Sequence, residues 1–187
     1  FPVAIKPLDG NHGRGVTLDI NTWRDAEAAY DAASAASKTR MVIVERYYQG
    51  RDHRVLVVDG KVAAVAERVP AHVIGDGRST INELIETTNR DPHRGQGHDN
   101  VMTRIELDRS SFDLLRKQRY SLDTVLREGE VCYLRATANL STGGIAIDRT
   151  DEIHADNIYL AARAAKIIGL DIAGIDIVTP DISRPLA

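Results

Sequence analysis

The sequence is poor in cysteine and aromatic residues and has no long hydrophobic run. One of its 187 residues, Cys132, is a cysteine, and 5% are aromatic. A single cysteine excludes an internal disulfide and fits a reducing compartment. No apolar run reaches the roughly 18 residues that a membrane span needs, and no secretory signal is visible. We therefore expect a cytoplasmic protein with no membrane partner.

The charge balance lacks the basic excess of many nucleic-acid-binding proteins. The formal net charge is -3, so no global basic field attracts phosphates. The stretch 89–100 interleaves its arginines and histidines with Asp91 and Asp99, and no nucleic-acid partner is expected. The remaining composition, 43% hydrophobic and 27% charged, is ordinary for a soluble α/β protein of one domain or two small lobes.

Both ends of the sequence have the patterns of interior segments. Phe1 to Ile5 has the pattern of a core strand, no initiator methionine is present, and residues 183–187 have the pattern of a turn. We therefore expect a piece of a longer polypeptide that would be inactive alone.

Short strands and one helix are expected in the first part of the chain. Thr22, with Asp25 three residues later, has the pattern of a helix N-cap. Asp59-Gly60 lies between two apolar runs and predicts a two-residue hairpin turn. The expected elements are strands at 3–5, 16–20 and 41–45, a helix at 25–37 and a hairpin at 54–66. Together they would form a small antiparallel lobe with a helix on one face.

The second part alternates loops with two clear helices. Thr80 and Glu83 form a capping-box pattern at the start of the first helix. Gly169 marks the end of the second helix, which begins near Ile153. The other expected elements are a loop at 89–100, helical turns within 110–127, a strand at 131–136, a loop at 139–144 and a buried strand at 172–178.

A glycine-rich loop follows the first strand. Lys6 ends this strand, and residues 10–15 contain three glycines, an asparagine, a histidine and an arginine. A lysine can hold a phosphate as a point charge, and glycines let backbone N–H groups approach phosphate oxygens. No Gly-Lys-Ser/Thr follows, so this is not a Walker loop. The alternative is a hairpin tip with Lys6 as a solvated strand end.

A second group of candidate residues follows the strand at 41–45. Glu45 lies at the end of this strand, and Asp52 follows seven residues later. A strand that runs into a linker can present its backbone to an adenine edge, and a carboxylate can accept both ribose hydroxyls. The alternative is a strand end with solvated charges.

Two further groups lie in the second half. Residues 135–144 combine Arg135 and Asn139 with hydroxyls and two glycines, a set that can surround a transferring phosphoryl group or an acyl phosphate. A well-formed turn is the alternative. Asp176 lies in an apolar strand, where a carboxylate needs a partner or a metal ion. One carboxylate does not make a magnesium site, so other ligands must come from elsewhere.

Taken in this order, these segments resemble an ATP-grasp ligase. Within that superfamily the sequence is most similar to the cyanophycin synthetases. The stretches that carry the likeness span nearly the whole chain: KPLDGNHGRG at 6–15, GRDHR at 50–54, AERVPAHVIGDG at 66–77, NRDPHRGQGHDN at 89–100, LRATANLSTGGIAID at 134–148 and IGLDIAGIDIVTP at 168–180.

The resemblance implies an α+β fold of two lobes, each with a mainly antiparallel sheet and helices, at residues 1–70 and 71–187. It implies ATP and Mg²⁺ as cofactors, with Asp176 as the first metal ligand and Arg135 and Asn139 at the reacting phosphate and carboxylate. Arg54 and His72 could line the substrate side. The implied ATP-binding residues are Lys6, Asn11, His12, Gly13, Arg14, Gly15, Glu45, Arg46, Tyr47, Tyr48 and Asp52.

The resemblance also implies a reaction. ATP would phosphorylate the C-terminal carboxylate of a growing cyanophycin chain, and the amine of aspartate would attack the acyl phosphate. The implied partners are a cyanophycin primer and aspartate, in a homo-oligomeric parent enzyme. One alternative is the ATP-grasp domain of bifunctional glutathione synthetases, which uses glycine and γ-glutamylcysteine; residues 52–54 and 136–139 favour the cyanophycin branch. Another is a non-catalytic nucleotide-binding module.

Overall fold

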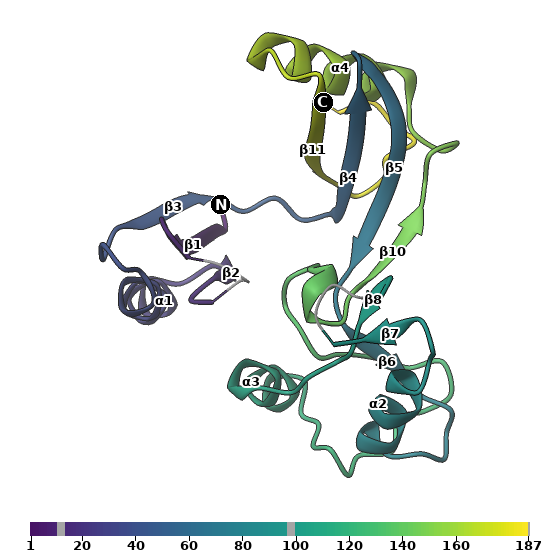
Figure 1. Cartoon of the computed structure of the whole chain (residues 1–187). Helices are drawn as coiled ribbons and strands as arrows, with labels where there is room; N and C mark the ends of the chain where they lie inside the picture. The colour runs from purple at the N-terminus through teal and green to yellow at the C-terminus, as the bar shows by residue number, and fades with distance from the viewer. Residues whose placement is uncertain (11–13, 97–99, 187) are drawn as a thin grey trace. The chain divides into compact units, whose positions relative to one another are not determined.

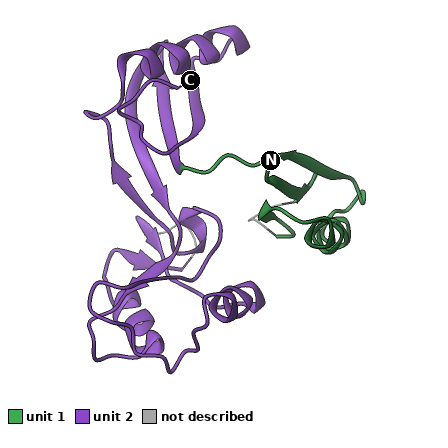
Figure 2. Cartoon of the chain, turned by 180° about the vertical axis from the view of Figure 1, so that it is seen from behind, with its two compact units in different colours: residues 1–50 green, residues 51–187 purple. Residues whose placement is uncertain are grey.

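The computed structural model describes residues 1–10, 14–96 and 100–186, which form two compact units. Unit 1 comprises residues 1–50 and unit 2 residues 51–187 (Figure 2). Each unit has a hydrophobic core of its own. Within the part of the chain that is described, no helix has the length and apolar character needed to cross a membrane.

Unit 1 is a three-stranded antiparallel sheet with one helix on one face (Figure 1). The helix starts after Thr22, whose hydroxyl accepts the backbone N–H of Asp25, as the N-cap pattern predicts. Its small residues Ala29 and Ala33 pack against Ile5 of the sheet. The sheet has the order β2-β1-β3, and the elements are β1 (Val3–Pro7), β2 (Thr17–Ile20), α1 (Trp23–Ala36) and β3 (Val42–Arg46).

The larger sheet of unit 2 is antiparallel and has the order β10-β5-β4-β11. Its strands are β4 (Arg51–Val58), β5 (Lys61–Val69), β10 (Ile145–Asp148) and β11 (Ile172–Thr179). Asp59 and Gly60 both have positive φ angles, 49° and 71°, as the predicted two-residue hairpin turn requires. Helix α4 (Ala155–Ile168) packs its Ala161 on Val55 and Val57. Side chains that alternate with these two valines therefore lie on the sheet face opposite α4.

The rest of unit 2 is built from short elements around a second core. These elements are β6 (His72–Ile74), α2 (Ile81–Asn89), β7 (Arg94–Gly95), β8 (Met102–Thr103), α3 (Arg109–Lys117), β9 (Val131–Tyr133) and the 3-10 turn η1 (Leu140–Thr142). Strand β6 pairs with β9, and β7 pairs in parallel with β8. Thr80 and Glu83 form the predicted capping box before α2. Ile81, Leu126 and Leu134 lie at the centre of this core.

The predicted α+β class with mainly antiparallel sheets is confirmed, but two details are different. The hairpin does not extend the sheet of unit 1, because β4 pairs with β11 and β5 pairs with β10. Strand β11 is not buried on both faces, since α4 covers only one of them; Asp176 lies on the open face, and its side chain is 53% exposed. The compact units divide the chain at residue 50, and the lobe boundary at residue 70 stays a prediction.

Candidate functional site

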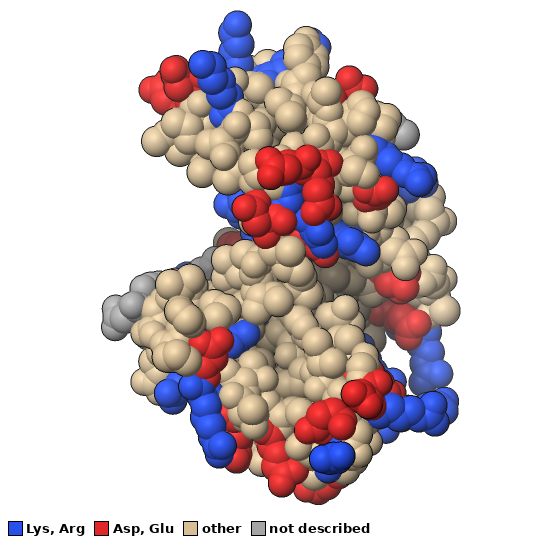
Figure 3. Space-filling view, turned by 90° about the vertical axis from the view of Figure 1, so that its right-hand side faces the viewer, with Lys and Arg blue, Asp and Glu red and all other residues tan. Residues whose placement is uncertain are grey.

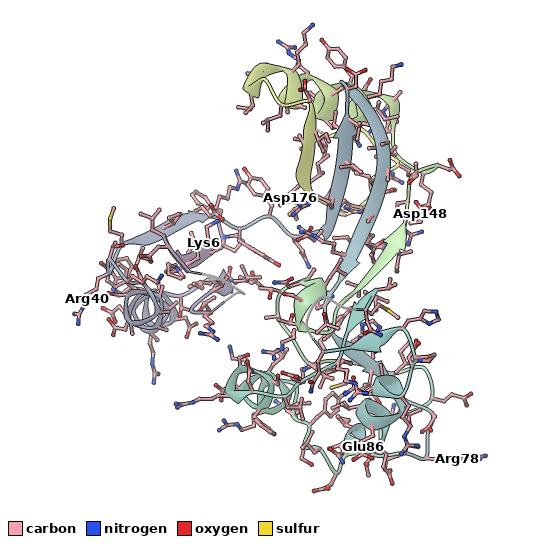
Figure 4. The ribbon with its side chains drawn as sticks, in the orientation of Figure 1. Lys6, Arg40, Arg78, Glu86, Asp148 and Asp176 are labelled. Atoms are coloured by element: carbon pink, nitrogen blue, oxygen red, sulfur yellow. The ribbon has the colours of Figure 1, made fainter. Side chains whose placement is uncertain are left out.

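Lys6 and Glu45, which sequence analysis assigned to two separate groups, meet on the sheet of unit 1. Ile5 faces α1, so the neighbouring Lys6 points to the opposite face of the sheet. Glu45 pairs in register with Ala4 and lies on the same face. The Lys6 Nζ donates to Glu45 Oε1 at 2.7 Å, and the side chains of Lys6 and Glu45 are 37% and 49% exposed. Lys6 is labelled on the sheet of unit 1 in Figure 4. Because exposed ion pairs contribute under about 1 kcal/mol, a phosphate could engage Lys6 at little cost.

The described ends of the glycine loop have structural reasons for glycine. Gly15 has a φ of +70°, and a Cβ there would lie 2.6 Å from the Cβ of Ala36 on α1. A Cβ on Gly10 would lie 2.4 Å from Pro7 Cγ. Arg14 is exposed. The candidate residues Asn11, His12 and Gly13 lie outside the described residues. Gly10 therefore lies close against Pro7, and Gly15 lies close against α1. The contact of these glycines with a nucleotide stays a prediction.

The predicted adenine-binding segment, residues 45–48, begins on an edge strand. The Tyr47 N–H donates to the Pro2 carbonyl at 2.9 Å, so this N–H is already satisfied. Among the described residues, strand β3 pairs with β1 alone, and hydrogen bonding alternates along an antiparallel strand. The backbone groups of Arg46 therefore face the unpaired side. The Arg46 guanidinium lies 5.2 Å from the ring centroids of Phe1 and Tyr48, which holds this strand end in place.

The other candidate charges form a network on the open face of the larger sheet in unit 2. Arg68 donates from Nε at 2.9 Å and from Nη2 at 2.5 Å to Asp52 Oδ1, and its Nη2 also lies 3.1 Å from Asp176 Oδ1. Arg54 holds Asp176 with both ends of its guanidinium, Nε to Oδ1 at 2.6 Å and Nη2 to Oδ2 at 3.3 Å. Two carboxylates and two guanidinium groups are thus joined, with no net charge.

Sequence analysis missed Arg68 of this network and did not assign a role to the neighbouring Gly174. Arg68, which bridges the predicted ribose and metal carboxylates, was not singled out at all. Gly174 makes room for Arg54, because a Cβ there would lie 2.8 Å from both Cδ and Nη1 of the arginine. Arg54 pairs with Asp176, and its expected place on the substrate side stays a prediction. The hairpin turn alone does not reveal this bridge, because the register that sets Asp52 opposite Arg68 includes a shift between Leu56 and Val57.

The residues present fit a magnesium ion only in part. A carboxylate oxygen is the ligand that Mg²⁺ prefers, and the ion commonly uses one or two carboxylates together with substrate phosphates. Asp176 offers such an oxygen on an open face, but Oδ1 accepts from both arginines. Among the described residues, no group of three His, Cys, Asp or Glu side chains is arranged to hold a metal. Asp176 could therefore supply one ligand, and the others must come from the nucleotide or from elsewhere.

Arg135 is held against the start of helix α3. Its Nη1 donates to Asp108 Oδ2 at 2.5 Å and to Ser110 Oγ at 3.1 Å, and its Nη2 donates to the Glu106 carbonyl at 2.8 Å. Burial alone would raise the pKa of the Asp108 carboxyl, yet hydrogen bonds from Ser110 and Arg135 keep that pKa well below its usual range. Arg135 Nε is buried and has no partner among the described residues. Its expected contact with a reacting phosphate stays a prediction.

The two ends of the Asn139 side-chain amide differ in their hydrogen bonds to the described residues. Its Oδ1 accepts from the N–H of Ser141 at 3.2 Å and from the Ser141 hydroxyl at 2.9 Å, which caps η1. No hydrogen bond from Nδ2 to another described residue is found. The amide oxygen therefore caps the turn, and the expected contact of Asn139 with a reacting group stays a prediction.

His72 is fixed by its own turn. Its Nδ1 lies 2.8 Å from the Pro70 carbonyl, and because a carbonyl only accepts, Nδ1 carries the hydrogen. The ring stands 5.9 Å from that of Tyr133, centroid to centroid. The contact of His72 with a substrate stays a prediction.

Two grooves in the part of the chain that the structure describes lie apart from these residues. In unit 1 an apolar groove is lined by Val3, Ile5, Trp23 and Tyr30, on the α1 side of the sheet rather than the Lys6 side. In unit 2 a second groove lies between the hairpin turn and the end of α4. Acidic and basic side chains are interspersed on the face in Figure 3, without a broad patch of one sign. The candidate site therefore consists of open charged faces within each unit.

Comparisons with known proteins give relatives along the whole chain, although no family model matches it. Cyanophycin synthetases from Geminocystis herdmanii and Trichormus variabilis are 70% and 71% identical over 186 residues, 100% of this chain and 21% and 20% of those proteins. A bifunctional glutathione biosynthesis protein from Streptococcus mutans is 35% identical over 96% of this chain and 24% of its own length. The chain thus spans about a fifth of the length of these two cyanophycin synthetases.

A solved structure supports the same relationship. The crystal structure of a bifunctional glutathione synthetase from Pasteurella multocida matches 100% of this chain and 25% of that one, with a TM-score of 0.69 and 33% identity. The likeness to ATP-grasp ligases that the motifs indicate is therefore confirmed, and over its whole length the chain is similar to a segment of the cyanophycin synthetases.

Proposed function

We propose that this chain is part of the ATP-grasp domain of a cyanophycin synthetase, an ATP-dependent ligase that joins a peptide carboxylate to an amine. The observation that carries this function is the 70% and 71% identity to cyanophycin synthetases over the whole chain, compared with 35% to the glutathione branch. The meeting of Lys6 with Glu45, and of Asp52 with Asp176 through Arg68, supports the nucleotide assignments.

In the proposed reaction, the γ-phosphoryl group of ATP passes to the C-terminal carboxylate of the cyanophycin primer, giving ADP and an acyl phosphate. The amine of aspartate then attacks the acyl carbon, an amide bond forms and phosphate leaves. Catalysis would rest on positioning and charge neutralisation. Mg²⁺, when bound with the nucleotide, supplies charge neutralisation at the phosphates. The chain would contribute Lys6, Asn11 to Gly15, the segment Glu45 to Tyr48, and Asp52 to ATP binding.

Further roles in unit 2 complete the proposal. Asp176 would ligate Mg²⁺, Arg135 would meet the reacting phosphate, and the Asn139 amide donor would meet the reacting carboxylate. Arg54 and His72 would lie on the substrate side. We also propose that the parent enzyme is cytoplasmic and homo-oligomeric.

The test uses a full-length synthetase that carries this chain, with cyanophycin primer, ATP and Mg²⁺. ADP release is followed with aspartate plus arginine, and separately with glycine plus γ-glutamylcysteine. Primer-dependent release that requires aspartate is expected. Release only with glycine and γ-glutamylcysteine would move the chain to the glutathione branch, and no release with either pair would refute the ligase function.

A further inference from the structure

Arg94 is a buried arginine that belongs to none of the groups described above. It lies on β7 and is 7% exposed. Its Nη1 donates to two backbone carbonyls, that of Thr103 at 2.8 Å and that of Gly143 at 3.0 Å. One nitrogen with two hydrogens therefore fixes the spacing between strand β8 and the loop that carries Asn139.

Gly143 is the point at which this loop is supported. It has a φ of +92°, and a Cβ there would lie 2.8 Å from Cγ1 and 2.9 Å from Cα of Ile105. Ile105 is itself fixed, because its N–H donates to Asn89 Oδ1 at 2.8 Å and its carbonyl accepts from Asn89 Nδ2 at 2.9 Å. The loop thus rests on a residue that the end of α2 holds through both of its backbone groups.

Hydrogen bonds inside the loop connect Gly143 to Asn139. The Gly143 N–H donates to the Leu140 carbonyl at 3.3 Å, and the N–H groups of Thr142 and Gly144 both donate to the Asn139 carbonyl at 3.2 Å. Since Asn139 Oδ1 also caps this turn, a shift of Gly143 would rotate the Asn139 amide. The Arg94 contact is therefore coupled to the orientation of Asn139 Nδ2, which has no hydrogen-bond acceptor among the residues that the structure describes.

Burying the charged guanidinium of Arg94 costs free energy, so the fold depends on the hydrogen bonds that this group makes. Desolvation lowers the pKa of the Arg94 guanidinium, because burial disfavours the charged form. A buried polar group destabilises the fold unless its hydrogen bonds are made. A lysine would offer a single point of donation on a flexible stem in place of a planar guanidinium, so it would restore the charge without restoring the geometry.

We propose that Arg94 is a positioning residue that acts through the Gly143 carbonyl to orient Asn139. This role rests on the proposed function, in which Asn139 meets the reacting carboxylate. It predicts that loss of Arg94 lowers turnover and leaves ATP binding unchanged, since no ATP-binding residue of the chain contacts Arg94 among the hydrogen bonds of the described residues.

The experiment is a double-mutant cycle in the full-length synthetase, with Arg94→Ala, Arg94→Lys, Asn139→Ala and the double variants. Arg90→Ala is the matched control, because Arg90 is an exposed arginine on the same segment. For Arg94→Ala we expect kcat for ADP release to fall by on the order of 100-fold, the loss that a 1 Å misplacement can cause. The KM for ATP should change less than about twofold. In the Asn139→Ala background, loss of Arg94 should lower kcat no further.

The outcomes of this experiment distinguish the positioning role of Arg94 from the role of Asn139 and from the proposed function. Equal kcat losses from Arg94→Ala in both backgrounds would overturn the positioning role, because the arginine would then act independently of Asn139. A large loss in Arg90→Ala would also overturn it. If Arg94→Ala does not fold, the Arg94→Lys cycle decides the same question. If Asn139→Ala keeps full activity, the role of Asn139 is wrong, and if the unmodified enzyme releases no ADP, the proposed function is wrong.

Discussion

At the residue scale, the notable feature is that each candidate carboxylate already has a cationic partner. Asp176 is held by Arg54 and Arg68, and Asp52 by Arg68. The guanidinium groups hold both carboxylates on the open face of the sheet through short hydrogen bonds. A cation at Asp176 would have to share or replace these contacts, and the anionic phosphates of a nucleotide would then attract the released arginines.

Asp176→Asn tests this arrangement in the full-length enzyme. The asparagine keeps the shape of the side chain but loses the charge that a magnesium ion needs. We expect ADP release to fall at least about 100-fold, as after loss of one electrostatic stabiliser. The free energy of unfolding should change by less than about 1 kcal/mol, because the lost ion pair is exposed. Asp151→Asn, at an exposed residue of a turn, is the control, and unaltered magnesium-dependent activity of Asp176→Asn would refute the metal assignment.

The network shows why site residues were only partly predictable. Lys6, Glu45, Asp52 and Asp176 stood out by type and order. Arg68 did not, because its position depends on a register shift between Leu56 and Val57. Extending the hairpin from Asp59-Gly60 without that bulge would place Glu67 opposite Asp52. The Arg54–Asp176 contact joins residues 122 positions apart, and no local pattern reports which strands become neighbours.

At the element scale, the most accurate predictions came from caps and turns. Thr22, the Thr80–Glu83 box and the Asp59-Gly60 turn all have the expected geometry, because each depends only on neighbouring residues. Sequence analysis missed the capping box at Asp108 before α3, because the residue three positions later is Ser111 rather than a glutamate or glutamine.

Asp108 has two functions at the start of α3 that two substitutions can separate. Its carboxylate accepts from the Ser111 N–H at 3.1 Å and pairs with Arg135. Asp108→Asn keeps the capping oxygen and loses the charge, whereas Asp108→Ala loses both. We expect both variants to be less stable than the parent in urea unfolding, with Asp108→Ala lower than Asp108→Asn by about 1 kcal/mol, the usual value of an N-cap. Equal stability of the two variants would mean that the cap contributes nothing.

The hydrogen bonds of Asp76, in the turn before α2, predict how the stability of the fold depends on pH. Hydrogen bonds from the backbone and hydroxyl of Ser79, and from the Arg78 N–H, lower the pKa of Asp76 from 3.8 to about 2. Between these values the unfolded chain binds more protons than the folded one, so the stabilisation is present above about pH 4 and is lost as the pH falls toward 2. In thermal unfolding, Asp76→Asn should therefore lie below the parent at pH 5, and the difference in Tm should shrink toward pH 2. A difference that is constant with pH would contradict this assignment.

At the scale of the whole molecule, the chain divides into units whose cores do not share residues. The core of unit 1 lies between residues 3 and 42, and the two cores of unit 2 lie between residues 55 and 186. Residues 47–50, between β3 and β4, belong to no helix or strand. We therefore expect each unit to keep its fold without the other. Composition alone could not locate this division, because the hairpin looked like a continuation of the first sheet.

Limited proteolysis with chymotrypsin tests this division. Tyr48, in the linking segment, is 62% exposed, while Tyr159 on α4 is 61% exposed and Tyr30 on α1 is 49% exposed. A protease needs an extended, locally open backbone as well as an accessible side chain, so the equally exposed tyrosine within a helix serves as an internal control. We expect cleavage after Tyr48 first, giving a fragment of residues 49–187 that resists further digestion and unfolds cooperatively. Cleavage at Tyr159 at the same rate, or a fragment without a cooperative transition, would show that unit 2 depends on unit 1 for its fold, and the division at residue 50 would then describe the geometry of the chain but not its stability.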